Sequence, residues 1–232
     1  MPADNHLALW TIFSDWHALV LMLNYVVSFG GFLAIGNFLP NHLLKYHETD
    51  DTVTLLITAA FLTLICVKRV LYGPLTDKLE GPNSTILGMV VTGIGAFIFA
   101  SSPRGNFWDW RPISGLFILT SGMGCAASGT FKWIPLAFPG NTGPIGGAVG
   151  SIGALGGFVL STILGAMGGE AKSIHLFTGL VIFMIVLDGI LDYQEYKEHH
   201  SVKQMCQDRR GKSVVFHAGD HDLITAHEFE HG

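Results

Sequence analysis

The chain has 232 residues, of which 49% are hydrophobic and 13% are charged, and its formal net charge is −5. Soluble domains carry about 25% charged residues, so this composition predicts an integral membrane protein in contact with a lipid bilayer. The negative charge and the lack of a basic stripe exclude nucleic acid as a partner. The three cysteines, Cys66, Cys125 and Cys206, lie far apart and show neither a disulfide framework nor a zinc-binding spacing.

Six apolar segments follow one another along the chain, and short loops rich in turn residues separate them. Residues 1–17 form a lead-in without the basic residues of a cleavable signal peptide. Each segment is close to the roughly 20 residues that a membrane-spanning helix needs. We therefore predict an all-α integral membrane fold with a six-helix domain over 18–192, whose spans cover 18–40, 52–76, 84–100, 112–138, 145–167 and 174–191.

Charged residues concentrate in the loops and in a polar tail over residues 193–232. If the tail is cytoplasmic, seven Lys and Arg residues lie on that side and four on the other, as the positive-inside rule prefers. Six spans then place both termini in the cytoplasm, and we expect the plasma (inner) membrane. The tail carries two histidine pairs with a spacing of four, His217 and His221, and His227 and His231. No cysteine accompanies them, so we interpret the segment as a solvated tail and expect neither a metal site nor a cofactor.

Arg69 lies inside the second segment, eight residues before Asp77, which is expected to mark the cytoplasmic end of that span. Eight helical residues cover about 12 Å. Half of the hydrocarbon core is about 15 Å thick, so Arg69 is predicted near the middle of the membrane. A charge there costs roughly 2.5–3.5 kcal/mol and usually faces a water-filled cavity with a function. The alternative is an arginine that snorkels to the interface, and for the neighbouring Lys68 we favour snorkelling over a substrate role.

Tyr25 and Phe29 are four residues apart and share one face of the first span. Aromatic residues at this spacing more often pack in a core than contact a ligand, so the pair alone decides nothing. Asn37 is a polar residue in the same span and needs a partner, which either another helix or a lumen would provide.

Glycines crowd the fifth segment, at Gly146, Gly147, Gly150, Gly153, Gly156 and Gly157. On a helix, Gly146, Gly150, Gly153 and Gly157 fall within an arc of about 60°. In a bilayer, such a stripe allows two helices to approach closely. A flexible linker is the alternative, and the Ile, Val, Leu and Phe residues between the glycines argue against it.

Titratable groups in this chain do not suggest an enzyme. No nucleophile with a base, no facing histidine pair for haem and no phosphate-binding loop is recognised. No carboxylate is expected in mid-span. Asp188 and Asp192 lie near the cytoplasmic end of the sixth span, where we expect them to contact water.

Three stretches carry a family resemblance. They are YVVSFGGF and GNFLP within 25–40, RVLYGPLTDKLEG at 69–81, and GTFKWIP at 129–135 with GAVGSIGALGGF at 147–158. They are similar, in order, to the seventh helix, the eighth helix with its following loop, and the tenth and eleventh helices of a nitrate/nitrite porter of the major facilitator superfamily. The chain thus resembles the C-terminal half of such a porter, in its last six helices. The Asn-Gly pair usual in the tenth helix is Ala127-Ser128 here, which leaves the polar contacts of that helix open.

The resemblance implies nitrate/nitrite transport by alternating access, as uptake or as nitrate/nitrite antiport. It implies that Arg69 grips the anion and that Tyr25 and Phe29 sandwich it, and we add Asn37 as a candidate substrate contact. A planar guanidinium suits a flat, delocalised anion because it offers paired donors. Gly147, Gly150, Gly153, Gly156 and Gly157 are the signature expected to let helices slide. The lack of a mid-span carboxylate favours anion exchange.

One six-helix half cannot enclose a transport path, so a partner is expected. It is either a separately encoded N-terminal half, which we favour, or a second copy of this chain around a two-fold axis. A non-transporting membrane subunit or an incomplete fragment of a porter remains the alternative function.

Overall fold

The structure is a computed structural model that describes residues 13–168, 171–191 and 193. The predicted polar tail, most of the lead-in, Asp192 and Cys206 lie outside the described residues. The described residues up to Ile190 form one unit. The described elements are all helical: α2 (Trp16–Tyr25), η1 (Val26–Gly30), α3 (Gly31–Tyr46), α4 (Asp51–Leu71), α5 (Gly73–Leu79), α6 (Gly81–Ala100), α7 (Trp110–Ala137), α8 (Thr142–Ala166) and a last helix, Ala171–Leu191.

Six helical stretches among the described residues are long and apolar enough to cross a membrane, which confirms the predicted six-helix transmembrane fold. The first stretch, Trp16–Tyr46, joins α2, η1 and α3 and begins where the Asp15 carboxylate accepts a hydrogen bond from the His17 backbone amide at 2.8 Å. It continues six residues beyond Pro40, where we had predicted its end. A proline removes one backbone hydrogen bond, and a helix packed in a membrane protein tolerates that loss.

The second predicted span is wrong at its C-terminal end. The sequence analysis treated residues 52–76 as one helix, but α4 ends at Leu71 and a separate short helix, α5, begins at Gly73. Gly73 and the proline after it favour the start of a new helix over continuation of the old one. Arg69 therefore lies in the last turn of α4, and a straight helix to Asp77 no longer measures its depth.

A π-helical turn, η1, interrupts the first spanning helix at Val26–Gly30. The sequence analysis did not predict it. π-helical turns are rare, and they concentrate at functional sites because they turn side chains out of the regular α-helical register. Here the turn lies directly after Tyr25 and contains Phe29, so it sets the positions of both aromatic rings.

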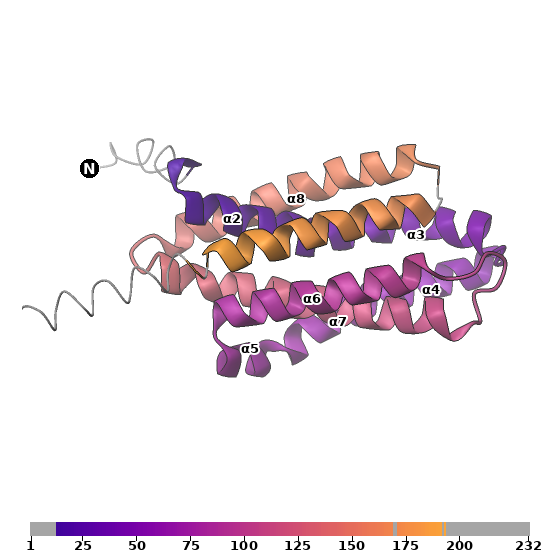
Figure 1. The fold of residues 1–232 in the computed structure, drawn as a ribbon, viewed down its shortest axis with the longest axis horizontal. Coiled ribbons are helices and arrows are strands. Elements are labelled where there is room, and N and C mark those ends of the chain that lie inside the picture. Colours follow the sequence, from indigo (N-terminus) through magenta and orange to yellow (C-terminus); the bar gives the residue numbers. More distant parts are fainter. Residues whose placement is uncertain (1–12, 169–170, 192, 194–232) are drawn as a thin grey trace, which may run out of the picture. The chain divides into compact units, whose positions relative to one another are not determined.

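Helices α6 and α7 form the tightest interface, with glycines at seven-residue intervals: Gly81, Gly88 and Gly95 on α6, and Gly115, Gly122 and Gly129 on α7. A Cβ atom on any of these six would lie 2.7 Å or less from a backbone atom of the facing helix. A strict spacing of seven keeps one seam in contact along a left-handed crossing. Figure 1 shows the two helices side by side along their length.

The glycines of α8 divide into two groups. A Cβ on Gly156 would meet Val26 Cγ1 at 2.5 Å, one on Gly157 would meet Gly30 Cα at 3.1 Å, and one on Gly153 would collide with the Tyr25 ring. Gly147 and Gly150 have nothing within 4 Å of that position among the described residues. The close approach of α8 to α2 and η1 thus uses the second half of the predicted stripe, and a packing role for Gly147 and Gly150 stays a prediction.

The last helix packs against three earlier ones. Its Phe177 ring lies over Gly31 of α3, and Val181 faces Gly93 of α6. Asp188 bonds to Asn24 of α2. In Figure 1 this helix, in orange, runs between α6 and the first spanning helix.

Candidate functional site

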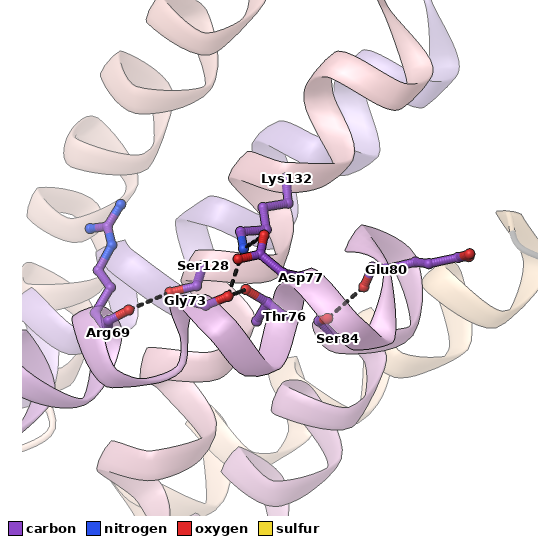
Figure 2. Close-up of polar contacts among 8 residues, drawn as sticks. All are labelled: Arg69, Gly73, Thr76, Asp77, Glu80, Ser84, Ser128 and Lys132. Carbon is purple, nitrogen blue, oxygen red and sulfur yellow. Dashed lines mark hydrogen bonds and ion pairs between the residues drawn. The ribbon is translucent and has the colours of Figure 1, made fainter.

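Arg69 of α4 reaches across to the first spanning helix. Its Nη2 donates a hydrogen bond to the Tyr25 hydroxyl at 2.9 Å. The Ser128 hydroxyl donates to the Arg69 backbone carbonyl at 2.8 Å, so α7 fixes the backbone from which the side chain extends. Figure 2 shows the guanidinium extending away from Ser128 and Lys132. A polar contact from the tenth-helix equivalent therefore exists, and Ser128 provides it.

Three aromatic rings surround the guanidinium. Its Cζ lies 5.6 Å from the Tyr25 centroid, 5.8 Å from Phe29 and 5.6 Å from Phe131. The Tyr25 and Phe29 rings stack at 4.9 Å with an interplanar angle of 9°, and Phe131 meets Tyr25 edge-on at 4.9 Å. The negative ring faces attract a cation, so these three rings stabilise the guanidinium. The structure therefore brings Arg69, Tyr25 and Phe29 together, and it adds Phe131. The Tyr25 and Phe29 rings stack on each other and leave no slot between them, so the expected sandwich of an anion stays a prediction.

A cavity of about 60 Å³ lies beside this group. Its lining comprises Ser28, Phe29, Phe32, Ile65, Cys66, Arg69, Met123, Gly124 and Ala127. Arg69 is the one charged residue in that lining, and the rest is mainly apolar. A water needs roughly 10–15 Å³ of such space, so the cavity has room for a small anion and leaves it little hydration.

The depth of the group follows from the first spanning helix. Its 31 residues, Trp16–Tyr46, extend about 46 Å, so its midpoint lies about 23 Å from either end. Tyr25 is nine residues from Trp16, or about 14 Å, which places it about 9 Å from that midpoint. A hydrocarbon core centred on the helix reaches about 15 Å to each side. With the core centred in this way, Arg69 and Tyr25 meet inside it and off its midplane. The mid-membrane depth of Arg69 stays a prediction.

Lys68 does not snorkel, contrary to the sequence analysis. Its side chain is buried, and its ammonium donates to the Phe117 carbonyl at 2.8 Å, to Thr120 Oγ1 at 2.9 Å and to Ser121 Oγ at 2.7 Å. The same nitrogen lies 3.4 Å from the centroid of the Phe117 ring. All three ammonium protons therefore have acceptors on α7. Lys68 joins α4 to α7 and is not available to a substrate.

Asn37 lies elsewhere. Its side-chain amide is exposed and donates to Ser161 Oγ of α8 at 3.2 Å, and it does not line the cavity beside Arg69. Twelve residues separate it from Tyr25, so the helix carries it about 18 Å farther along. Of the two roles that the sequence left open for Asn37, the structure shows the helix–helix bond.

The short helix α5, which follows Arg69 in the chain, is bonded to α7. The Lys132 ammonium donates to the Gly73 carbonyl at 2.6 Å and forms an ion pair with Asp77 (Figure 2). The Thr76 hydroxyl donates to the same carbonyl at 2.8 Å, and the Ser84 hydroxyl donates to the Glu80 carbonyl at 2.5 Å. Glu80 has a φ of 64°, in the left-handed region that side chains other than glycine seldom adopt. The short helix α5 is thus held at both ends.

Asp188 also departs from the sequence-based expectation. It was expected to contact water, but its side chain is 0% exposed and Oδ1 accepts a hydrogen bond from Asn24 Nδ2 at 2.6 Å. A buried carboxylate does therefore lie within a spanning helix of this half. Its bonding partner, Asn24, directly precedes Tyr25.

Comparison with known families agrees with this architecture. A family model, the Major Facilitator Superfamily, matches residues 21–216. The chain belongs to this superfamily.

Relatives of this Major Facilitator Superfamily chain have names that refer to nitrate and nitrite. It is 30% identical over 167 residues to the probable nitrate transporter NarT of Staphylococcus epidermidis, covering 72% of this chain and 42% of the relative. It is 26% identical over 186 residues to the nitrite extrusion protein of Bacillus subtilis, covering 78% and 46%. It is 27% identical over 156 residues to the probable nitrate/nitrite antiporter NarK1 of Thermus thermophilus, covering 60% and 34%. The resemblance to nitrate/nitrite porters is confirmed, and the chain spans less than half the length of these relatives.

Two residues of the site were missed in the sequence. Phe131 stands inside the GTFKWIP stretch, and nothing in its spacing relates it to Tyr25 on a helix more than a hundred residues earlier. Ser128 was counted as a departure from a family pattern, whereas a serine one turn before an aromatic residue is also a donor suited to a neighbouring carbonyl. Only the packing of α4 and α7 beside the first span reveals both roles.

Proposed function

We propose that this chain is one half of an alternating-access transporter that moves nitrate and nitrite across the plasma membrane, by uptake or by exchange. One observation carries the proposal. The Arg69 guanidinium faces an apolar cavity inside an aromatic enclosure, and its side-chain partner is the neutral Tyr25 hydroxyl. Among the described residues, no carboxylate forms an ion pair with Arg69. Its positive charge is therefore available to bind an anion.

The chemistry of the enclosure supports a small planar anion. A guanidinium offers two parallel N–H donors, which match two oxygens of nitrate or nitrite. The stacked Tyr25 and Phe29 rings define a flat surface. A planar ion makes more contact with such a surface than a spherical ion does. The mainly apolar lining of the cavity also disfavours strongly hydrated anions such as sulfate.

We propose further that a second six-helix unit completes the path. The relatives named for nitrate transport are more than twice as long as the region that this chain matches. On α8, Gly147 and Gly150 are open, and the Asn37–Ser161 hydrogen bond is exposed. Bare backbone and an exposed amide are costly against lipid, so a protein partner is favoured there. We favour a separate N-terminal half over a second copy of this chain, because the glycine stripe of α8 resembles that of a half that packs against a different neighbour.

Arg69→Lys tests the role of the guanidinium. It keeps the charge but removes the paired donors, so nitrate affinity should fall by about tenfold or more while the protein still inserts and folds. Affinity is measured by the thermal shift of the purified protein with nitrate, nitrite, chloride and sulfate. Arg111→Lys is the matched control, because Arg111 is exposed and lies over a tryptophan ring at 5.8 Å.

Two results would contradict the proposal. Near-normal nitrate binding or flux by Arg69→Lys would remove Arg69 from the site. A stable monomer in mild detergent, with no thermal shift by nitrate or nitrite, would favour a non-transporting subunit or an incomplete fragment. The mass of the purified complex, with and without nitrate, distinguishes a heterologous partner from a homodimer.

A further inference from the structure

A carboxylate with an unused oxygen is buried between the first and last helices. Asp188 is 0% exposed, and its Oδ1 accepts the short hydrogen bond from Asn24 Nδ2, at 2.6 Å. Its Oδ2 has no hydrogen-bond partner among the described residues, and neither does the Asn24 Oδ1. Asn24 is itself 0% exposed. Two acceptor oxygens without partners among the described residues therefore lie at this buried interface.

No positive side chain compensates Asp188 among the described residues. Of the helices that contact the last one, α6 contains no titratable side chain. On α3, the titratable residues His42, Lys45 and Tyr46 all follow Pro40, toward the end of the helix that is far from Asn24. Lys172 begins the last helix and lies 16 residues, or about 24 Å, from Asp188.

The first helix adds no cation at Asp188 either. His17 contacts Asp15 at the start of α2, seven residues or about 10 Å before Asn24. Tyr25 is the next residue after Asn24, but its hydroxyl is directed to Arg69. Among the described residues, the Asp188 carboxylate thus has the Asn24 amide as its hydrogen-bond donor.

Such a site favours the binding of a proton. An ionised carboxylate without a paired cation is among the most costly groups to bury. A proton that is taken from water and binds at Oδ2 removes this negative charge. Oδ1 can keep the Asn24 hydrogen bond in both forms. The proton-loaded form is therefore the one that suits the closed helix interface.

Asn24, the partner of Asp188, is also connected to the cavity beside Arg69. The Asn24 backbone carbonyl accepts a hydrogen bond at 2.8 Å from the Ser28 hydroxyl, and Ser28 lines the cavity beside Arg69. Asn24 precedes Tyr25, which bonds to Arg69. Ser28 belongs to the π-helical turn η1, whose register also positions Phe29. A change at Asp188 thus reaches the cavity wall through one continuous segment.

We propose that Asp188 and Asn24 form a proton-binding site coupled to the anion cavity, so that a proton and an anion bind this half together. The proposal rests on the transport function proposed above, but it contradicts our sequence-based preference for exchange without protons. A proton on Asp188 offsets the charge of the anion that Arg69 accepts. By reciprocity of binding, anion loading tightens proton binding by the same factor.

Infrared spectroscopy of the purified protein tests the proton site without any transport. A protonated carboxyl in an apolar site gives a separate C=O stretching band. We expect this band at neutral pH, its loss in Asp188→Asn, and its retention in Asp51→Asn, a control in which the carboxylate is exposed at the start of α4. Asn24→Ala, which leaves the carboxyl in place but removes its hydrogen bond, should shift the band. A band unchanged in Asp188→Asn would overturn the proposal.

Nitrate affinity across the pH range then tests the coupling. We expect the wild-type affinity to fall by about fivefold or more on the alkaline side, and the affinity of Asp188→Asn to change little, because the amide mimics the proton-loaded acid. Identical pH profiles of the two proteins would overturn the coupling. Absence of nitrate binding at every pH would reject the proposed function, while the infrared band would still decide the proton site.

Discussion

Gly30→Ala places one methyl group at the contact between η1 and α8. The added Cβ would lie 2.7 Å from the Gly157 backbone nitrogen and 2.8 Å from the Gly153 carbonyl oxygen. Both neighbours are backbone atoms, so no side-chain rotation relieves the clash. Ordinary contacts begin at 3.4 Å, so the two helices must separate locally by about 0.7 Å.

The energetic outcome combines two opposing effects. Overpacking of a tight interface costs about 1–3 kcal/mol. Replacing a helical glycine by alanine gains about 1 kcal/mol of helix propensity. We therefore expect a net loss of about 0–2 kcal/mol in the free energy of unfolding, together with a displaced Tyr25–Phe29 stack.

Unfolding in mixed detergent micelles, followed by circular dichroism, measures the change in stability. Gly93→Ala is the matched control, because its Cβ would contact Val181 Cγ1 at an ordinary 3.5 Å, so it should be neutral or slightly stabilising. Nitrate affinity should fall for Gly30→Ala and remain unchanged for Gly93→Ala. If the two variants were equally stable and bound nitrate equally well, the close approach of η1 to α8 would be refuted.

Three further perturbations have defined outcomes. Phe131→Ala should weaken nitrate binding by about 2- to 30-fold, because one of the three rings around Arg69 is lost. Nitrate titrations measure this change. Phe97→Ala, which removes an exposed α6 side chain, is the control and should leave nitrate affinity unchanged. Lys132→Ala should lower stability by at most about 1 kcal/mol, since its ion pair with Asp77 is partly exposed. It should also speed hydrogen exchange in α5. Unchanged exchange in α5 would contradict the role of Lys132 in holding α5 to α7. Burial lowers the pKa of His47, so the unfolded state binds a proton first, and stability should be lost as the pH falls below about 6.5; melting curves of His47→Gln should lack that loss.

Much of the fold was predictable because each spanning helix is long, apolar and bounded by turn residues. The pairing of Arg69 with Tyr25 and Phe29 was also predicted, although only through family resemblance. The break after Leu71 was not predicted, because residues 52–76 were treated as one span although Gly73 and the proline after it signal the start of a new helix. A π-helical turn has no local sequence signature, so η1 could not have been predicted.

Interhelical partners were the least predictable feature. Lys68 and Arg69 are adjacent and equally charged, yet one bonds to α7 and the other faces a cavity, since about 100° of helix rotation separates them. Asp188 was assigned to water because of its place near a helix end, and its burial depends on α2 lying against it. In contrast, the seven-residue glycine spacing of α6 and α7 was visible in the sequence. It was not interpreted, because the sequence analysis considered the denser glycine cluster of α8 instead.

The buried Lys68 ammonium has a consequence for how the chain is made. Its acceptors, Phe117, Thr120 and Ser121, are synthesised 49 to 53 residues after it. During that interval α4 carries two cations in its last turn, of which Lys68 still lacks its acceptors, so it is a poor candidate for release into the bilayer alone. Helix α4 should therefore remain at the insertion machinery until α7 emerges, and the two helices should enter the membrane as a pair.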